Sequence, residues 1–247
     1  MERDWRVHHP VLPVEPDVTI ELSSAESHHV HRVLRLRKGD GLSVFDGNGR
    51  ERSGVVVGGG PGCVTLRLQE EVERQVEAPV EIELFQALCR PDRMEWVIQK
   101  ATEIGVGTVH PFPAERAEGR APTPGRLERW RRIAIEACKQ SGRRRVPAIE
   151  PSEDLPAPPP GRTAILLDGG SRARPLGELL VGPGEAAAWI AVGPESGLAA
   201  DEVDRALELG WRAGHLGPRT LRTETAGLVA ATIVLHRWGD LGPQAES

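Results

Sequence analysis

The sequence predicts an α/β protein that is preceded by a smaller, β-rich region. Short apolar runs separated by turn residues fill roughly the first 75 positions. The composition then shifts near residue 72, and beyond it apolar runs alternate with segments of helical periodicity. Two later runs, at 164–167 and 188–192, are continuously apolar, which is typical of strands buried on both faces of a parallel sheet. We therefore expect a domain boundary between residues 74 and 75.

The N-terminal region is expected to contain several strands and one helix. The capping-box spacing of Ser23 and Glu26 predicts a helix that runs to about Leu36. Two turn dipeptides at 46–49, between apolar runs, predict a β-hairpin. A glycine-rich turn at 58–62 comes before the last strand, and strands at this spacing favour a small barrel. The expected strands are 17–22, 42–45, 51–57 and 64–68.

The C-terminal region shows apolar residues at helical spacing in three segments. Gly105 and Gly142 follow the first two of them, where a helix C-cap favours glycine. Alternation of strands and helices predicts crossover connections in a mainly parallel sheet. The proline-rich stretch 151–160 is expected to be a surface connection, because proline cannot join a strand ladder. The expected helices are 94–104, 127–138 and 224–238, and the expected strands are 80–85, 164–167 and 188–192.

Composition and charge exclude several classes of protein. The chain has 31 Lys and Arg against 36 Asp and Glu, a net charge of −5, so it is not a globally basic nucleic-acid binder. It has no Tyr and three Phe, which disfavours an RNA-recognition sheet built on stacked aromatics. No apolar run reaches the ~18 residues of a membrane span, and the charged N-terminus does not resemble a secretory signal. The distant cysteines Cys63, Cys89 and Cys138 predict neither a disulfide framework nor a zinc site and favour the cytoplasm.

Three glycine-bearing loops follow apolar runs, at 168–170, 193–197 and 216–219. In an open parallel sheet, ligands bind at the carboxyl ends of the strands, where glycine lets backbone approach closely. The three loops together predict a shared ligand pocket, with ordinary turns as the alternative. None matches the dinucleotide-binding fingerprint, the P-loop or the hydrolase nucleophile elbow.

The segment 216–225 combines two arginines, one glutamate and three threonines just before the last expected helix. Thr223 is expected to be the N-cap of that helix. Arg222 and Glu224 could form a simple surface ion pair. We favour a functional role for them because charges at a helix N-terminus beside two glycine loops suit a ligand site.

Basic residues form two local clusters on this acidic chain. Window 24–38 holds four basic residues against Glu26, and window 126–145 holds eight against Glu128 and Glu136. Such clusters bind phosphate backbone in some proteins and are solvated helix faces in others. The three histidines at 28, 29 and 31 are not expected to bind metal, because neighbouring helix positions point to different sides.

The ordered set of motifs resembles the bacterial 16S ribosomal RNA uracil-N3-methyltransferases, which belong to the SPOUT superfamily. The likeness runs nearly from end to end. The family usually has a second glycine where Ser196 stands and an aromatic residue where His8 stands. The matching segments are 29–35, 45–47, 94–105, 137–143, 192–198 and 216–226.

The resemblance implies an N-terminal PUA-like β-barrel, at 1–74, that helps to hold RNA. It implies a SPOUT α/β domain, at 75–247, whose deep trefoil knot forms the S-adenosylmethionine site. It further implies a homodimer that methylates N3 of a uridine in the 16S ribosomal RNA of the small subunit, with no metal and no membrane. The implied cofactor-binding residues are Leu167, Asp168, Gly169, Val192, Gly193, Pro194, Glu195, Leu216, Gly217, Pro218, Leu221 and Arg222.

Two residues are hypothesised to be catalytic. Arg222 would stabilise negative charge on a uracil carbonyl oxygen, and Glu224 would be the general base or its orienter. The alternatives are a SPOUT methyltransferase acting on another RNA and a non-catalytic RNA-binding assembly factor. The residues expected to contact RNA are Arg6, His29, Arg32, Arg35, Arg143, Arg144 and Arg145.

Overall fold

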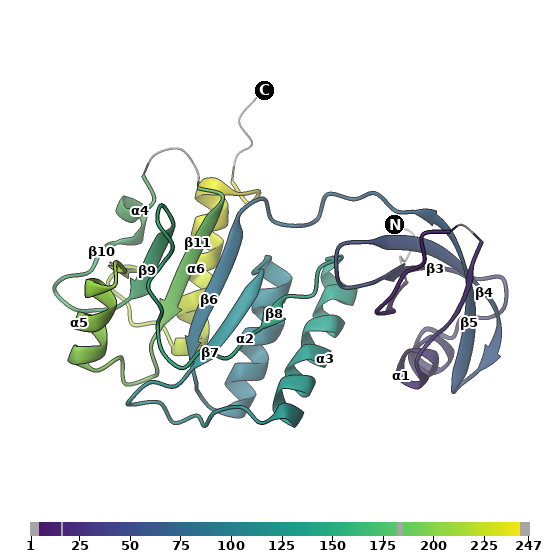
Figure 1. Cartoon of the computed structure of the whole chain (residues 1–247), viewed down its shortest axis with the longest axis horizontal. Coiled ribbons are helices and arrows are strands. Elements are labelled where there is room, and N and C mark those ends of the chain that lie inside the picture. The colour runs from purple at the N-terminus through teal and green to yellow at the C-terminus, as the bar shows by residue number, and fades with distance from the viewer. Residues whose placement is uncertain (1–4, 16, 182–184, 243–247) are drawn as a thin grey trace. The chain divides into compact units, whose positions relative to one another are not determined.

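The computed structural model describes residues 5–15, 17–181 and 185–242 (Figure 1). The chain divides into two compact units. Unit 1 comprises Met1–Glu77 together with Cys138–Val146, and unit 2 comprises Ala78–Ala137 together with Pro147–Ser247. The sequence did not predict that the segment Cys138–Val146 belongs with the N-terminal part of the chain.

Unit 1 is built on a five-stranded sheet in the order β1-β3-β4-β5-β2. The predicted hairpin is confirmed, because β3 and β4 pair antiparallel with Phe45 opposite Glu51. Apolar side chains that alternate along the strands, such as Val44, Leu66 and Leu68, form its core. The strands are β1 (Arg6–His8), β2 (Thr19–Glu21), β3 (Gly41–Phe45), β4 (Glu51–Gly60) and β5 (Cys63–Glu71).

The predicted helix of unit 1 begins where the capping box placed it. The Ser23 hydroxyl accepts a hydrogen bond from the Glu26 backbone N–H at 3.2 Å, and α1 spans Ser24–His28. The chain continues as a π-helix over His29–Leu34. It ends at Arg35, whose φ of 59° lies in the left-handed region.

Unit 2 contains a seven-stranded sheet in the order β10-β12-β9-β11-β6-β7-β8, in which every pair is parallel. The α/β class predicted for this region is confirmed. Its strands are β6 (Glu81–Ala87), β7 (Thr108–Phe112), β8 (Ala148–Ile149), β9 (Thr163–Leu167), β10 (Arg174–Pro175), β11 (Ala187–Val192) and β12 (Arg212–His215). Its helices are α2 (Pro91–Ile104), α3 (Pro124–Ser141, which enters unit 1 at Cys138), α4 (Leu176–Leu179), α5 (Ala200–Glu208) and α6 (Thr223–Trp238).

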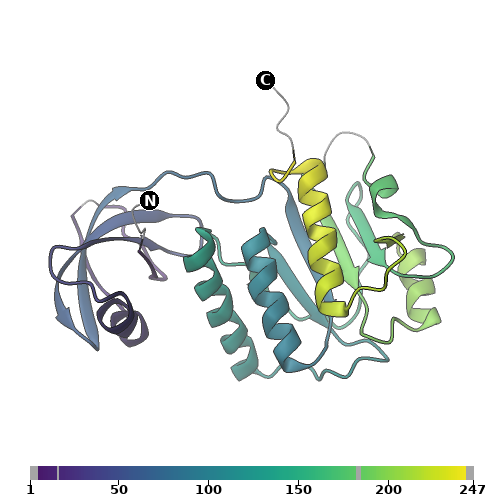
Figure 2. The ribbon, with the colours of Figure 1, turned by 180° about the vertical axis from the view of Figure 1, so that it is seen from behind.

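Helices α2 and α6 lie side by side on one face of the unit 2 sheet (Figure 2). Helix α6 approaches the sheet closely at Gly227. A Cβ at that position would lie 2.8 Å from Leu84 Cδ1 and 3.0 Å from Val192 Cγ2. The other face carries an aromatic cluster of Phe85, Trp189 and Trp211, against which α5 packs. The sheet is therefore buried on both faces, as its continuous apolar strands predicted.

One local prediction about α6 is wrong. Arg222 occupies the N-cap position, and Thr223 is the first residue of the helix. The Thr223 hydroxyl does not cap the helix and donates to the Gly193 carbonyl instead. The deep trefoil knot stays a prediction.

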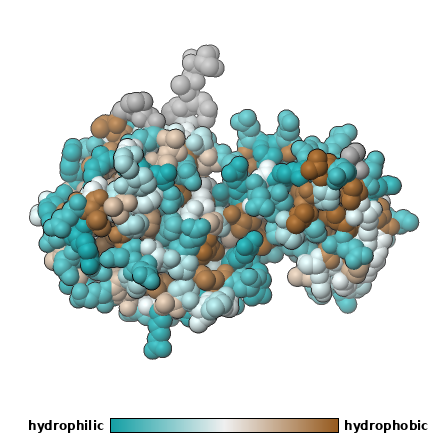
Figure 3. All heavy atoms as spheres, in the orientation of Figure 1, coloured by the Kyte–Doolittle hydropathy of each residue, from teal (hydrophilic) through white to brown (hydrophobic). Residues whose placement is uncertain are grey.

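Hydrophilic residues cover most of the face of unit 2 in Figure 3, and the apolar patches there are small and separate. Among the described helices, none is long and apolar enough to cross a membrane.

Candidate functional site

The carboxyl ends of the parallel strands lie at one edge of the unit 2 sheet, the lower edge in Figure 1. Loops leave that edge after β6, β9, β11 and β12. Three of them are the glycine loops that the sequence singled out. The fourth, after β6, leads into α2 and was not predicted to take part.

The loops after β9 and β12 present accessible backbone. Asp168 N–H donates to the Gly214 carbonyl at 3.0 Å, which ties the loop after β9 to strand β12. Gly217 has a φ of +103°, which favours glycine, and its N–H donates to His215 Nδ1 at 3.1 Å. A Cβ at Gly169 or Gly217 would meet no atom within 4 Å, so a ligand can approach the backbone at both positions.

The loop after β11 is anchored to α6 and β6 through buried polar groups. The Thr223 hydroxyl donates to the Gly193 carbonyl at 2.6 Å, and Gln86 Nε2 donates to Thr223 Oγ1 at 2.9 Å. Gln86 is fully buried, and its Oε1 has no hydrogen-bond partner among the described residues. These two hydrogen bonds fix the start of α6 beside the loop that follows β11.

The loop after β11 also accommodates Ser196, at a position where the resemblance to known sequences implied a second glycine. Ser196 keeps an ordinary negative φ, and the left-handed position falls on Gly197, with a φ of +73°. The Ser196 hydroxyl donates to the Arg116 carbonyl at 3.3 Å. A serine therefore fits here without backbone strain.

A cluster of charged side chains completes this edge. Arg93, near the start of α2, forms a short ion pair with Glu195 from the loop after β11. Its Nε lies 3.9 Å from Glu224 Oε1, and Arg222 Nη1 lies 3.9 Å from the same oxygen. Glu224 Oε2 is buried and has no hydrogen-bond partner among the described residues. We call Arg93, Glu195, Arg222 and Glu224 the edge cluster.

The Cys89 thiol lies close to the edge cluster. Burial, together with the negative charges of Glu195 and Glu224, raises the pKa of this thiol from 9.0 to about 12. The thiol therefore stays protonated at neutral pH. Because the thiolate is the nucleophilic form, Cys89 is not equipped to attack a substrate.

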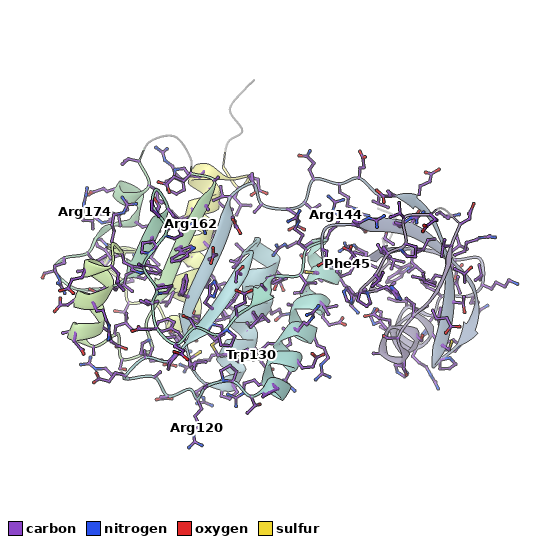
Figure 4. All side chains as sticks on the ribbon, viewed as in Figure 1. Phe45, Arg120, Trp130, Arg144, Arg162 and Arg174 are labelled. Carbon is purple, nitrogen blue, oxygen red and sulfur yellow. The ribbon has the colours of Figure 1, made fainter. Side chains whose placement is uncertain are left out.

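The segment between β7 and α3 runs beside the end of β6. Gly119 N–H donates to the Leu88 carbonyl at 3.3 Å, and a Cβ on Gly119 would come within 2.8 Å of Cys89 O. Arg120 follows directly, and its side chain extends away from the ribbon at the lower edge (Figure 4). An exposed arginine thus stands on the same edge as the glycine loops.

The seven residues predicted to contact RNA all belong to unit 1, but they differ in accessibility. Arg32, Arg35 and Arg145 are exposed. Arg6 and Arg143 are 5% and 4% exposed. His29 and Arg144 are half-buried.

Arg6 is held by buried partners within unit 1. It donates from Nε and Nη2 to Glu51 at 3.0 and 3.2 Å, and from Nη1 to the Cys138 carbonyl at 2.6 Å. Its guanidinium also lies 4.7 Å from the centre of the Phe45 ring, which is labelled in Figure 4. These contacts assign Arg6 a structural role in unit 1, and contact with RNA stays a prediction.

Arg143 pairs in a similar way with Glu77. Its Nε and Nη2 lie 3.0 and 2.9 Å from Glu77 Oε2. The other oxygen of Glu77 accepts from the backbone N–H groups of Arg144 and Arg145 at 2.7 and 3.0 Å. The carboxylate thus holds the segment Cys138–Val146 to the rest of unit 1.

Sequence reasoning brought the three glycine loops, Arg222 and Glu224 to one edge, and the structure places them there. It missed Gln86, Cys89 and Arg93. The available signal was positional, because these residues lie between the expected strand 80–85 and the expected helix 94–104. No group of three or more His, Cys, Asp or Glu side chains that could hold a metal is found among the described residues.

Comparisons with known proteins agree with this architecture. A family model described as an RNA methyltransferase domain matches residues 76–235, and one described as an RNA methyltransferase PUA domain matches residues 22–69. The chain is 33% identical to ribosomal RNA small subunit methyltransferase E of Synechocystis sp., over 87% of this chain and 72% of that protein. Identity with the Bacillus subtilis protein of the same name is 28%, over 91% and 92%.

Two solved structures are similar over almost the whole chain. Ribosomal RNA small subunit methyltransferase E from Neisseria gonorrhoeae, bound to S-adenosyl methionine, matches with a TM-score of 0.88 and 31% identity. That match covers 96% of this chain and 99% of the other. The Legionella pneumophila protein Lpg2936, in complex with the bound cofactor SAM, matches with a TM-score of 0.86 and 27% identity, over 97% and 100%.

Proposed function

Because this chain belongs to the family of RNA methyltransferases that carry a PUA domain, we propose that it methylates N3 of a specific uridine in 16S ribosomal RNA, using S-adenosylmethionine. The relatives that carry the name ribosomal RNA small subunit methyltransferase E support the substrate. The two similar structures solved with S-adenosylmethionine support the methyl donor. We also propose that the protein is a homodimer and that it acts in the cytoplasm.

The residues at the carboxyl edge fit S-adenosylmethionine. Accessible backbone at Gly169 and Gly217 offers N–H and C=O groups to a polar ligand. The carboxylate of Asp168 suits a ligand that carries sulfonium and ammonium charges. When bound, the donor supplies a methyl group that is already activated by its sulfonium. The remaining work of the protein is to orient the base and to remove its N3 proton.

The observation that carries the proposal is the pairing of Arg222 with Glu224 beside the glycine loops. The Arg222 side chain is 78% exposed and can reach a uracil carbonyl oxygen, where it would stabilise developing negative charge. Glu224 Oε2 is an acceptor without a hydrogen-bond partner among the described residues and would take the N3 proton. The electron pair left on N3 forms the new N–CH₃ bond, and the pair of the broken C–S bond stays on sulfur.

Orientation of the base and removal of its proton can each contribute a large part of the rate enhancement for methyl transfer. Holding two reactants in line supplies about 7–11 kcal/mol of a barrier. General-base help adds about 10²- to 10⁴-fold. The target uracil must be unpaired or flipped, because its N3 edge is hidden in a duplex, at a cost of a few kcal/mol.

The test is nucleoside mass spectrometry of 16S ribosomal RNA from cells with and without this gene. We expect 3-methyluridine to disappear without the gene and to return when purified protein and S-adenosylmethionine are added to small subunits from those cells. Arg222→Ala should abolish most of that recovery. A lost modification in a different RNA would favour the SPOUT alternative. No heat on titration with S-adenosylmethionine would favour a non-catalytic assembly factor.

A further inference from the structure

Glu224 has two carboxylate oxygens in different surroundings, and Arg93 is one of the two cations that lie beside Oε1. We infer that Arg93 is a positioning residue for methyl transfer, which holds Oε1 of Glu224 and leaves Oε2 to accept the proton of the target base. This inference rests on the proposed function. It concerns a residue of α2 that neither the glycine loops nor the motif 216–225 contains.

Arg93 has a fixed place in the fold. It is the third residue of α2, directly after the turn that follows β6. The next residue, Met94, is 1% exposed, and Val97 is fully buried, so the first turn of the helix is anchored on the core. The Arg93 side chain is 27% exposed, compared with 78% for Arg222. Of the two cations near Glu224, Arg93 is therefore the one whose position the fold determines.

The contacts of Glu224 are one-sided. Both guanidinium groups approach Oε1, each at 3.9 Å. Oε2 is buried and has no hydrogen-bond partner among the described residues. A buried acceptor without a partner is costly, and a catalytic role is one of the explanations for such an atom in a native protein. A carboxylate oxygen accepts hydrogen bonds only, so the matching group is an N–H or O–H of the substrate.

Arg93 also joins Glu224 to a second loop. Its Nη1 pairs with Glu195, so one guanidinium bridges a carboxylate from the loop after β11 and one from the first turn of α6. Without that cation, two like charges would face each other beside the neutral Cys89 thiol and would push the side chains apart. Arginine suits this task because its planar fork can bind two carboxylates at once.

The experiment measures methyl transfer to small ribosomal subunits from cells that lack the gene. It compares Arg93→Ala, Arg93→Lys, Glu224→Gln and the double variant that combines Arg93→Ala with Glu224→Gln. Arg90→Ala is the matched control, because Arg90 lies three positions earlier in an exposed ion pair with Asp92. Circular dichroism and calorimetry with S-adenosylmethionine check that each variant is folded and binds the donor.

We expect Arg93→Ala to lower kcat by about 10- to 100-fold with little change in KM for RNA. Arg93→Lys should recover part of the loss, and Arg90→Ala should match the wild type. The double variant should be no slower than Glu224→Gln, because a residue that acts through Glu224 has no effect without it.

The inference would be overturned if the double variant were slower than Glu224→Gln alone, or if Arg93→Ala left kcat unchanged. If Arg93→Ala does not fold, the same cycle is run with Arg93→Lys. Absence of methyl transfer by the wild type would instead reject the proposed function, so the two failures are distinguishable.

Discussion

The two units use arginine–carboxylate clusters in opposite ways. In unit 1, both oxygens of Glu51 are bound by Arg6, and both oxygens of Glu77 are bound by Arg143 and by backbone N–H groups. In unit 2, Glu224 has two cations near Oε1, whereas Oε2 has no hydrogen-bond partner among the described residues. We call the arrangement around Glu51 and Glu77 the closed cluster. The edge cluster is an open cluster, because Oε2 of Glu224 is left without a hydrogen-bond partner among the described residues.

The difference shows how to separate structural from functional charges. A buried ion pair is tolerated only when its remaining lone pairs and protons are bonded, so a closed cluster suits the interior of a fold. An open cluster leaves a group unsatisfied until a ligand arrives. Both kinds of cluster consist of arginines and carboxylates, so their charges do not distinguish them. What distinguishes them is whether each carboxylate oxygen has a hydrogen-bond partner.

The largest expected effect comes from breaking the buried ion pair between Arg6 and Glu51. Glu51→Gln removes the charge that compensates Arg6, whose side chain is 3% exposed. Breaking a buried ion pair in this way costs about 3–5 kcal/mol. Urea unfolding should therefore show a large fall in the free energy of unfolding of unit 1.

Glu71→Gln is the matched control, because Glu71 pairs with Arg50 at the surface of the same unit. Its urea midpoint should stay where it is in the wild type. Equal destabilisation by the two substitutions would show that the closed cluster contributes no more than a surface pair.

The second effect comes from neutralising the open cluster. Glu224→Gln keeps the shape of the side chain but cannot accept a proton as a carboxylate does. We expect methyl transfer to small subunits to fall by about 10²-fold, as for loss of a general base. The urea midpoint should change little, in contrast with Glu51→Gln. Wild-type turnover in this variant would leave Glu224 as a helix-terminus charge.

Sequence patterns predicted the architecture of unit 2 well because its signals are local. Continuous apolar runs marked β9 and β11, and helical periodicity followed by Gly105 marked α2. Parallel strands then bring the glycine loops to one edge by geometry alone. The boundary of α6 was wrong by one residue, because Thr223 spends its hydroxyl on the Gly193 carbonyl rather than on a cap.

The closed cluster could not be predicted in this way. Arg6 and Glu51 are 45 positions apart, and Arg6 and Cys138 are 132 apart. Pairing over such separations depends on the tertiary fold, and no local pattern reports it. Arg143 looked like part of a basic patch for the same reason. Nothing in the sequence distinguishes it from Arg145, although the first is buried and the second is exposed.

The third effect compares the two clusters through their neighbouring thiols. Burial raises the pKa of Cys138 in unit 1 to about 12, as it does for Cys89 in unit 2. Since each thiol has a higher pKa folded than unfolded, its contribution is complete below about pH 9 and is lost as the pH rises toward 12. Each thiol should therefore lower the unfolding free energy by about 1.4 kcal/mol per pH unit in that window.

Urea unfolding between pH 8.5 and 10.5 checks this expectation. Cys138→Ser and Cys89→Ser should each make the decline less steep, because serine does not ionise there. Cys63→Ser is the control for replacing a cysteine by serine at an exposed position. Equal slopes in all four proteins would mean that neither buried thiol retains its proton on folding.

The smallest expected effect concerns the exposed arginine side chains of unit 1 that are predicted to contact RNA, namely Arg32, Arg35 and Arg145. Arg32 is exposed on the π-helix, so it is free to neutralise a phosphate. Arg32→Gln should reduce the slope of log affinity against log salt concentration by about 0.7, the value for one single-stranded phosphate contact. Arg67→Gln, an exposed arginine on β5, is the control and should not change that slope. Binding of S-adenosylmethionine should be the same in both variants, because Arg32 and Arg67 belong to unit 1 and the donor site is proposed in unit 2. An unchanged slope in Arg32→Gln would remove this residue from the RNA-binding surface and would leave Arg35 and Arg145 to be tested in the same way.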